Sequence, residues 1–352
     1  MADSDATSAW TYRDAGVDID AAEEALRRAR SEIRSTFTER VLADVGSFGG
    51  LFSARGLGED PVLVATTDGV GTKVRIAAAT GRLEGVGRDL VQHCINDALV
   101  QGARPLFFLD YIGTGRLDPE AVARLIQGVA AACREHGLAL LGGETAEMPG
   151  VYPPGEFDLV GTLVGVVERA HLLDGGRVRP GDQLIGLPSR GLHTNGYSLA
   201  RRIVEERMGL AWEDPFPGVE GASAADLLLE PHACYLEVLE PFLKDPGLHA
   251  LAHITGGGIP GNLPRVLHGH RARIRRSVVP RQPLFEALVE AGQVPRDEAW
   301  RAFNMGVGMI LVVARDATRE FLTGLRGYGA DPFALGEVVP ADTVEEEVHW
   351  LD

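Results

Sequence analysis

The alternation of strands and helices begins with Pro61-Val62-Leu63-Val64-Ala65-Thr66-Thr67-Asp68-Gly69-Val70-Gly71-Thr72-Lys73. Its first seven residues are mostly apolar or β-branched, which is typical of a short strand. Asp68 ends that run, and glycines follow. Glycine lets a backbone approach a phosphate closely, and Lys73 adds a positive charge, so the stretch predicts a strand that ends in a phosphate-binding turn. A tight turn with a hydrophilic rim explains the same residues equally well.

Outward from this stretch, strand and helix patterns continue to alternate. The first half predicts helices at residues 20–40, 89–102 and 119–136, and further strands at 105–111, 138–141 and 159–167. Such alternation is typical of an α/β layered domain. Glycine, proline and aspartate gather at residues 174–182 and place a domain boundary near residue 170. We therefore expect a tail at 1–10, an N-terminal domain at 11–170 and a C-terminal α/β domain at 171–352.

The second half predicts strands at 183–187 and 307–313, with helical patterns at 195–208, 227–243 and 318–328. The whole chain, at 352 residues, is long enough for two domains.

Charge and composition exclude several classes of protein. The net charge is -16, from 50 acidic and 34 basic residues, and the one basic cluster, 271–281, has no interleaved aromatics. A nucleic-acid partner is therefore not expected. Three widely spaced cysteines predict neither a disulfide framework nor a zinc site. The sequence shows no signal peptide and no apolar run of about 20 residues, so we expect a cytoplasmic protein without membrane partners.

Acidic side chains recur on the helix predicted at 89–102. Asp89 starts its pattern, and Asn96 and Asp97 follow about two turns later on a similar face. Oxygen ligands of this kind suit Mg²⁺. The alternative is that Asp89 is an N-cap and Asp97 a surface charge.

A third acidic stretch is Gly142-Gly143-Glu144-Thr145-Ala146-Glu147, at the end of the strand predicted at 138–141. A loop of this composition could wrap a metal-bound phosphate, although a simple glycine turn would also fit. Carboxylates that converge without a positive partner repel one another, so a shared cation would explain the repetition of these motifs.

Two motifs in the second half suit anion binding. Thr194 or Asn195 can begin the helix predicted at 195–208, whose N-terminus would attract an anion, and His193 could contact a phosphate or exchange protons. The stretch Thr255-Gly256-Gly257-Gly258 could form a phosphate nest or a sharp loop.

Together these motifs resemble the phosphoribosylformylglycinamidine cyclo-ligase (aminoimidazole ribonucleotide synthetase) family. The resemblance runs from about residue 11 to the C-terminus and rests on residues 12–20, 68–73, 96–103, 107–111, 142–150, 193–199, 255–258 and 303–309. It implies ATP-dependent closure of formylglycinamidine ribonucleotide to 5-aminoimidazole ribonucleotide, with release of ADP and phosphate. It also implies a homodimer whose N-terminal sheets pair into a β-barrel, and a C-terminal mixed sheet flanked by helices.

The resemblance further implies roles for individual residues. Mg²⁺ ligands are expected at Asp68, Asp89, Asp97 and Glu144. Contacts to ATP are expected at Asp68, Gly69, Gly71, Thr72, Lys73, Asn96, Gly142, Gly143 and Thr145. Contacts to the substrate are expected at Glu147, His193, Thr194, Asn195, Gly256 and Gly257. The catalytic candidates are His193, Asp97 and Lys73.

The sequence argues against four other functions. A selenophosphate synthetase would carry a reactive cysteine near its N-terminus, and none precedes Cys94. A thiamine monophosphate kinase lacks the long run around 193–199. A catalytically silent nucleotide-binding scaffold would lack an acid or the lysine of these motifs. A dehydrogenase would show a GxGxxG after its first strand, and this chain does not.

Overall fold

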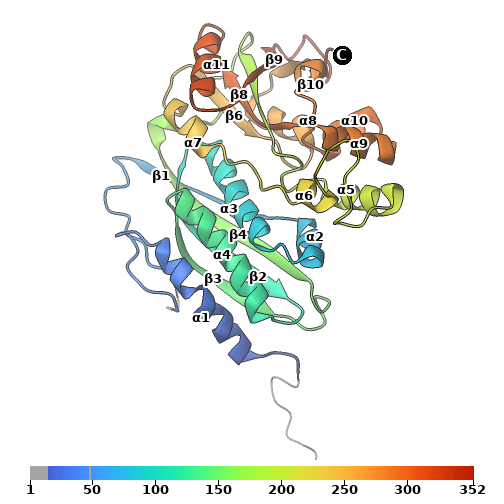
Figure 1. Cartoon of the computed structure of the whole chain (residues 1–352). Helices are drawn as coiled ribbons and strands as arrows, with labels where there is room; N and C mark the ends of the chain where they lie inside the picture. The colour runs from blue at the N-terminus through green and yellow to red at the C-terminus, as the bar shows by residue number, and fades with distance from the viewer. Residues whose placement is uncertain (1–14, 47–48) are drawn as a thin grey trace, which may run out of the picture.

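The computed structural model describes residues 15–46 and 49–352, so the predicted tail at 1–10 lies outside the described residues. Two β-sheets, each flanked by helices, form the protein (Figure 1). This confirms the predicted α/β class. The first sheet uses strands between residues 61 and 168, and the second uses strands between 183 and 350. The position of the domain boundary stays a prediction.

The first sheet has four strands in the order β1-β4-β2-β3. Their bounds are β1 (Pro61–Gly69), β2 (Arg104–Thr114), β3 (Ala139–Glu147) and β4 (Phe157–Glu168). β4 is antiparallel to both β1 and β2, whereas β2 and β3 are parallel. The carboxyl ends of β1, β2 and β3 therefore lie at the same edge of the sheet.

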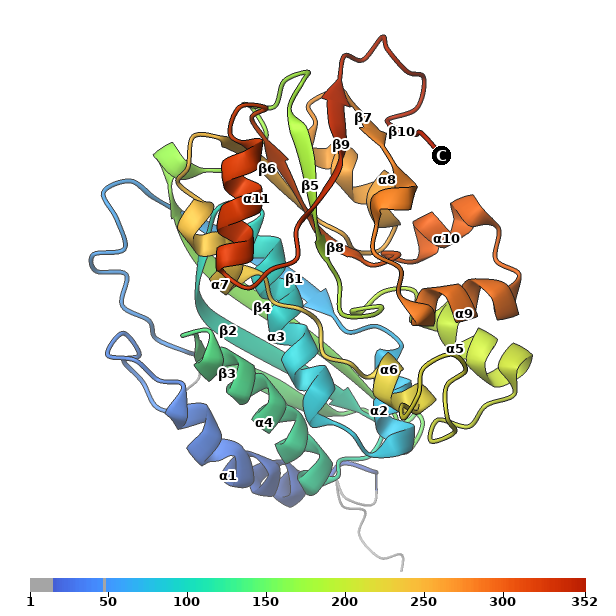
Figure 2. The ribbon, with the colours of Figure 1, turned by 45° about the horizontal axis from the view of Figure 1, so that its top comes forward.

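Three helices cover one face of this sheet: α1 (Ile19–Ser35), α3 (Glu84–Leu99) and α4 (Pro119–Glu135) (Figure 2). The Asp18 and Asp118 carboxylates accept backbone N–H bonds at the starts of α1 and α4, so both residues act as N-caps. The helix predicted to begin at Asp89 instead begins at Glu84. Asp89 thus lies inside α3 and is not an N-cap.

The opposite face of the first sheet carries apolar side chains without a covering helix among the described residues. Along β1, exposed residues alternate with partly buried ones, and Leu63 is 63% exposed. Ala65 pairs with Val164, which pairs with Phe107 on the neighbouring strand. Alternate strand residues point to opposite faces, so these residues form an apolar row on the uncovered side.

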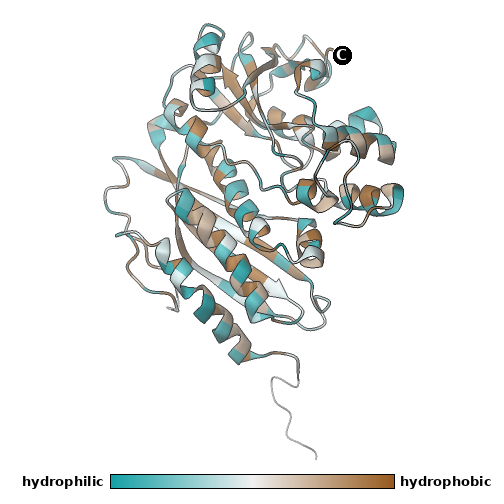
Figure 3. Cartoon of the chain, viewed as in Figure 1, coloured by the Kyte–Doolittle hydropathy of each residue, from teal (hydrophilic) through white to brown (hydrophobic). Residues whose placement is uncertain are grey.

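The second sheet is mixed, as predicted, with the order β10-β7-β9-β5-β8-β6. Its strands are β5 (Gln183–Pro188), β6 (Leu248–His253), β7 (Arg271–Ile274), β8 (Val307–Val313), β9 (Phe333–Val339) and β10 (Val348–Trp350). Every residue of β6 and β8 is buried. Colouring by hydropathy shows the strands of this sheet as largely hydrophobic (Figure 3). Burial on both faces explains why β8 is apolar throughout and does not alternate, whereas β6, at the edge of the sheet, includes His249 and His253.

The remaining helices lie in the connections between strands. They are α2 (Lys73–Thr80), α5 (Tyr197–Arg202), α6 (Ala224–Leu228), α7 (Leu236–Leu239), α8 (Gly258–Asn262), α9 (Pro283–Gly292), α10 (Arg296–Ala302) and α11 (Thr318–Gly327). A π-helical turn, Ile203–Met208, extends α5. Short 3₁₀ turns occupy Arg169–His171, Glu240–Phe242, Leu263–Val266 and Arg276–Val278.

Two predicted elements differ from the structure. The single helix predicted at 227–243 is interrupted between α6 and α7, where Pro231 cannot donate a helical hydrogen bond. The predicted loop at Gly142–Thr145 belongs to β3, because this glycine-rich stretch pairs with β2 through to its end.

Candidate functional site

The first part of the site lies at the carboxyl end of β1. Thr66 and Asp68 project from the same face of the strand, toward α3, and the Thr66 hydroxyl lies 3.5 Å from an oxygen of Asp97. The Asp68 carboxylate accepts a bond from the N–H of Gly69 (2.7 Å), and its side chain is 41% exposed. Gly71, at φ +57°, lets the chain turn from β1 into α2.

Helix α3 supplies the next two groups, His93 and Asp97, one turn apart. His93 Nε2 lies 2.8 Å from an oxygen of Asp68 and 3.5 Å from one of Asp97. His93 Nδ1 lies 2.6 Å from the Thr194 hydroxyl, which comes from the second half of the chain. His253, at the end of β6, places its Nδ1 2.8 Å from the other Asp97 oxygen. We call Asp68, His93, Asp97 and His253 the carboxylate–histidine cluster.

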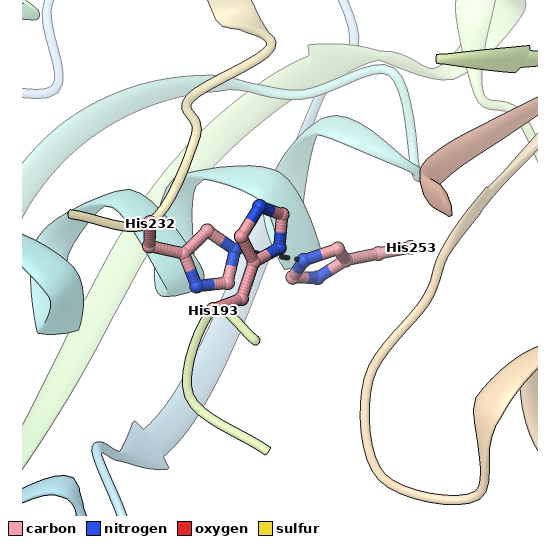
Figure 4. Close-up of side chains that lie close together, drawn as sticks. All are labelled: His193, His232 and His253. Atoms are coloured by element: carbon pink, nitrogen blue, oxygen red, sulfur yellow. Dashed lines mark hydrogen bonds between the residues drawn. The ribbon is translucent and has the colours of Figure 1, made fainter. Parts of the chain in front are cut away.

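A second group of histidines shares His253 with this cluster. His193, His232 and His253 lie together, each from a different segment of the second half (Figure 4). The His193 and His232 rings stack with centroids 3.9 Å apart. His232 Nε2 lies 3.1 Å from His253 Nε2. Burial, with the positive charge of neighbouring groups, lowers the pKa of His193 and His232 well below their usual value, so both are neutral near pH 7.

Electrostatics distinguish the two histidines that face carboxylates. Burial alone would lower the pKa of His93, but its bonds to Asp68 and Asp97 outweigh burial and raise that pKa to about 9. At His253, burial outweighs the bond to Asp97, and the pKa falls below its usual value. Burial would raise the pKa of Asp97, yet its bonds from His253 and His93 hold it well below the ordinary range. The cluster therefore holds two carboxylates around one imidazolium.

Lys73 and Asp89 form a separate ion pair, with Lys73 Nζ 2.6 Å from the carboxylate and both side chains 0% exposed. Lys73 Nζ also donates to the carbonyl oxygens of His193 (3.2 Å) and Glu230 (2.8 Å). Asp89 accepts the N–H of His232 (2.6 Å). The structure thus places Lys73 and Asp89 between the two halves, where all their polar atoms face protein. Neither reaches a solvent-exposed phosphate in this conformation.

Asn96 also links the two halves. Its amide donates to the carbonyl of Ala233 (2.7 Å) and accepts from the N–H of Tyr235 (3.0 Å). It is fully buried, so both ends of the side chain serve these backbone contacts. Thr72 is partly exposed and makes a hydroxyl–hydroxyl bond to Ser198 at 3.1 Å.

The loop before α5 lies against the cluster, and its backbone is constrained at His193. His193 has a φ of +60°, which is uncommon for a residue other than glycine. Its Nε2 accepts N–H bonds from Arg190 (3.1 Å) and Ala233 (3.4 Å). Side-chain and backbone contacts thus hold His193 in this conformation.

The substrate-side candidates extend from this loop toward solvent. Thr194 is buried, whereas Asn195 is partly exposed and Gly256 and Gly257 are exposed. A Cβ atom on Gly256 would lie 3.2 Å from the Asn195 side-chain oxygen, so the two predicted loops adjoin. Any larger side chain at Gly256 would press on Asn195.

The remaining predicted residues lie in another part of the first sheet. Gly142, Gly143, Glu144 and Thr145 line a cavity of about 640 Å³ between β3, α1 and residues 44–46 and 49–50. Register pairs Asp68 with Gly161, then Asp110, then Gly143. Adjacent strands are about 4.8 Å apart, so Gly143, at the cavity, lies roughly 14 Å from Asp68. Within one chain, therefore, Glu144 is not brought to Asp68 and Asp97.

Glu147, at the end of β3, serves the backbone of the first half. Its carboxylate accepts the N–H groups of Asp18 (2.5 Å) and Leu117 (2.7 Å). Those contacts tie the start of α1 to the sheet and place Glu147 away from the loops at Asn195 and Gly256.

Several residues of the site were not identified from the sequence: His93, His232, His253 and the cavity residue Asp110. His93 carried a usable signal, because it precedes Asp97 by four residues on a predicted helix and must share its face. The sequence contains no such signal for His253 and His232. His253 lies at the end of β6 and His232 in an irregular segment, and only the fold brings these two segments to α3. Burial raises the pKa of Asp110 to about 7.

Two family models match the chain: residues 52–167 match the AIR synthase related protein, N-terminal domain, and residues 179–349 match the AIR synthase related protein, C-terminal domain. A phosphoribosylformylglycinamidine cyclo-ligase of Geobacter sulfurreducens is 48% identical over 97% of this chain and 99% of its own length. One of Myxococcus xanthus is 48% identical over 93% of this chain and 95% of its own.

Among solved structures, a crystal structure of the hydrogenase maturation protein HypE in complex with ATP matches with a TM-score of 0.67 and 18% identity, over 93% of this chain and 89% of that one. At that identity the likeness concerns the fold alone. The matches at 48% identity cover nearly the whole chain and therefore show the family. The chain belongs to the phosphoribosylformylglycinamidine cyclo-ligase family.

Proposed function

We propose that this protein is an ATP-dependent cyclo-ligase of purine biosynthesis, which converts formylglycinamidine ribonucleotide to 5-aminoimidazole ribonucleotide. Membership of the family carries the proposal. The structural observation that supports it is the pair Asp68 and Asp97, two partly exposed carboxylates beside the glycine turn that follows β1.

The reaction needs ATP because an amide oxygen is a poor leaving group. Transfer of the γ-phosphoryl group to that oxygen gives an iminophosphate and ADP. The amine nitrogen of the amidine then attacks the activated carbon, the ring closes, and the former amide oxygen leaves as part of inorganic phosphate. The protein's contribution is to position the reactants and to neutralise the charge on the phosphoryl group.

Asp68 and Asp97 are the proposed ligands of Mg²⁺. Both carry their charge at neutral pH and present exposed oxygens, a donor set that suits a hard cation. When bound, Mg²⁺ would neutralise phosphate charge. Gly69, Gly71 and Thr72 lie beside them and are the proposed phosphate contacts. Lys73 and Asp89 act as positioning residues, because their buried pair fixes this turn against the second half.

The substrate is proposed to bind at Asn195, Gly256 and Gly257, which face solvent beside the cluster. His193 and Thr194 support this surface from within. Asn195→Ala should therefore raise the KM for formylglycinamidine ribonucleotide by about 10-fold, the effect of losing a hydrogen bond to a charged group, with little change in the KM for ATP. A change in the KM for ATP alone would contradict this assignment.

Gly142, Gly143 and Thr145 are proposed nucleotide contacts, since the cavity they line has the size of a small-molecule site. Gly142→Ala tests this directly. A Cβ atom there meets nothing nearer than Leu109 at 3.6 Å, so the fold tolerates it while the cavity shrinks. We expect weaker ATP binding with an unchanged thermal midpoint. Unchanged affinity would remove this cavity from the nucleotide site.

A homodimer through the uncovered face of the first sheet is the proposed assembly. Leu63 is exposed there beside the apolar row at Ala65, Val164 and Phe107, and large apolar patches mark interaction surfaces. Leu63→Glu should shift the mass measured by light scattering from dimer to monomer.

None of the described helices is long and apolar enough to cross a membrane. We propose a cytoplasmic location, in keeping with the three unpaired cysteines.

The function itself is tested by mixing the protein with MgATP and following ADP, with and without formylglycinamidine ribonucleotide. We expect ADP release that depends on this substrate, with one 5-aminoimidazole ribonucleotide formed per ADP. ATP binding without substrate-dependent turnover would contradict the proposal, and thiamine monophosphate and selenide would then be the next substrates to try.

A further inference from the structure

The carboxylate–histidine cluster contains nitrogen donors that an all-oxygen magnesium site does not need. One ligand atom each from His93, Asp97 and His253 lies within 4.8 Å of the others. The Asp68 carboxylate adds a fourth, 2.8 Å from His93 Nε2. Two imidazoles and two carboxylates are the ligand types and number of a tetrahedral zinc site.

The short contacts inside the cluster bring donor atoms together as a metal site would. His93 Nε2 lies 2.8 Å from an oxygen of Asp68 and 3.5 Å from one of Asp97 but has no hydrogen-bond partner, and His253 Nδ1 lies 2.8 Å from Asp97. Donor atoms of a tetrahedral site lie about 3.3 Å apart, given metal–ligand distances near 2.1 Å. Side-chain shifts of about an ångström, with release of the His93 Nε2 proton to solvent, would therefore seat an ion among these atoms.

The second nitrogen of each imidazole has a partner able to accept its proton. His93 Nδ1 lies 2.6 Å from the Thr194 hydroxyl, and His253 Nε2 lies 3.1 Å from His232 Nε2. Metal-binding histidines usually donate this other N–H to a nearby acceptor, which fixes the ring orientation and the tautomer. Thr194 and His232 fill that role here. Partial exposure of Asp68 and Asp97 leaves an entry path.

The neighbouring trio of His193, His232 and His253 is a weaker alternative (Figure 4). His193 Nε2 accepts two backbone N–H bonds, so its proton lies on Nδ1, the nitrogen buried without a partner. Ligation by either nitrogen would break those bonds or require an imidazolate. The trio also contains no carboxylate to balance a divalent charge.

We propose that His93, Asp97 and His253, together with Asp68, bind a divalent d-block cation such as Zn²⁺ or Co²⁺. Imidazole nitrogen favours these ions over Mg²⁺, which prefers oxygen. The site shares Asp68 and Asp97 with the proposed magnesium ligands, so its ion displaces Mg²⁺ and inhibits turnover. Only this inhibition rests on the proposed function; binding of the ion does not.

Cobalt titration of the full-length protein, without ATP or substrate, tests the binding. We expect one Co²⁺ per chain with the strong visible absorption of tetrahedral coordination, displaced by Zn²⁺. His93→Gln and His253→Gln should each lose that spectrum and bind Co²⁺ at least about 10-fold more weakly. His249→Gln is the matched control: His249 is also buried against a carboxylate (Asp182, 2.6 Å) but has no second histidine partner there.

Circular dichroism and thermal unfolding establish that each variant is folded. Weak octahedral absorption that both glutamine variants retain would overturn the proposal. Loss of the spectrum in His193→Gln with its retention in His93→Gln would also overturn it, because the ion would then belong to the histidine trio. Inhibition of substrate-dependent ADP release by Zn²⁺, reversed by a chelator, tests the shared ligands. Binding without inhibition would separate the two sites.

Discussion

Helix α3 carries two acids that differ in their surroundings. Asp89 is fully buried and paired with Lys73, whereas Asp97 is partly exposed and paired with His93 and His253. At 1.5 Å per residue, the two acids lie about 12 Å apart along the helix. The buried pair joins the two halves of the chain, and the partly exposed Asp97 lies at the same junction. One acid on this helix thus serves structure, and the other is available for the proposed chemistry.

Loss of the buried cation should have the largest effect. Lys73→Met leaves the Asp89 charge unpaired in the interior and should lower the free energy of unfolding by about 3–5 kcal/mol. Chemical denaturation measures this. The double variant Lys73→Met/Asp89→Asn should recover most of the loss, because asparagine still accepts the His232 N–H without a charge. An unstable double variant would show that Lys73 stabilises chiefly through its two carbonyl contacts.

At the C-terminal end of α3, Asp97→Asn should reduce turnover by about 10²–10³-fold, a loss typical of one electrostatic group at a reacting centre. The shape of the side chain is kept, so the thermal midpoint should stay close to that of the parent. Steady-state ADP release and a melting curve provide both values. Full turnover would remove Asp97 from the proposed magnesium site.

Asp110 is a third acid that is buried like Asp89 but has no cationic partner among the described residues. Burial raises its pKa to about 7 from 3.8, so the neutral form is favoured in the folded state. Its contribution to stability is complete below the unfolded pKa and disappears as the pH rises through about 7. Between about pH 5 and pH 7.5 the loss is roughly 2 kcal/mol. Asp110→Asn should abolish that part of the pH dependence in urea unfolding. A parallel dependence in both proteins would contradict the raised pKa.

The smallest effect is expected at the exposed link between the halves. The Thr72–Ser198 bond joins two hydroxyl groups in contact with water, so Ser198→Ala should change the unfolding free energy by less than about 1 kcal/mol. A larger loss in denaturation would show that this link, and not only the buried pair, holds the two halves together.

Sequence patterns predicted the strands and helices that have local signals. The strand predicted at the apolar run 307–313 is confirmed. The interruption near Pro231 and the continuation of β3 through Gly142 and Gly143 were not predicted. In β3, pairing with β2 outweighs the low strand propensity of glycine, which local sequence cannot reveal.

For the site, sequence reasoning identified Asp68, Asp89, Asp97 and Lys73 but could not separate them. Their exposure depends on the second half of the chain, which buries Lys73 and Asp89 completely. Asp68 and Asp97 stay partly exposed to solvent. The histidines at 232 and 253 reach α3 only through long-range packing. No spacing in the sequence encodes that contact.

The fate of one oxygen atom tests the central claim most directly. Formylglycinamidine ribonucleotide labelled with ¹⁸O at its formyl oxygen would be converted with MgATP in unlabelled water, and the phosphate product analysed by ³¹P NMR. Phosphorylation of the amide oxygen predicts one ¹⁸O in each phosphate released during ring closure. Unlabelled phosphate, with the label lost to water, would show that ATP hydrolysis and ring closure are separate events, and would contradict the proposed mechanism.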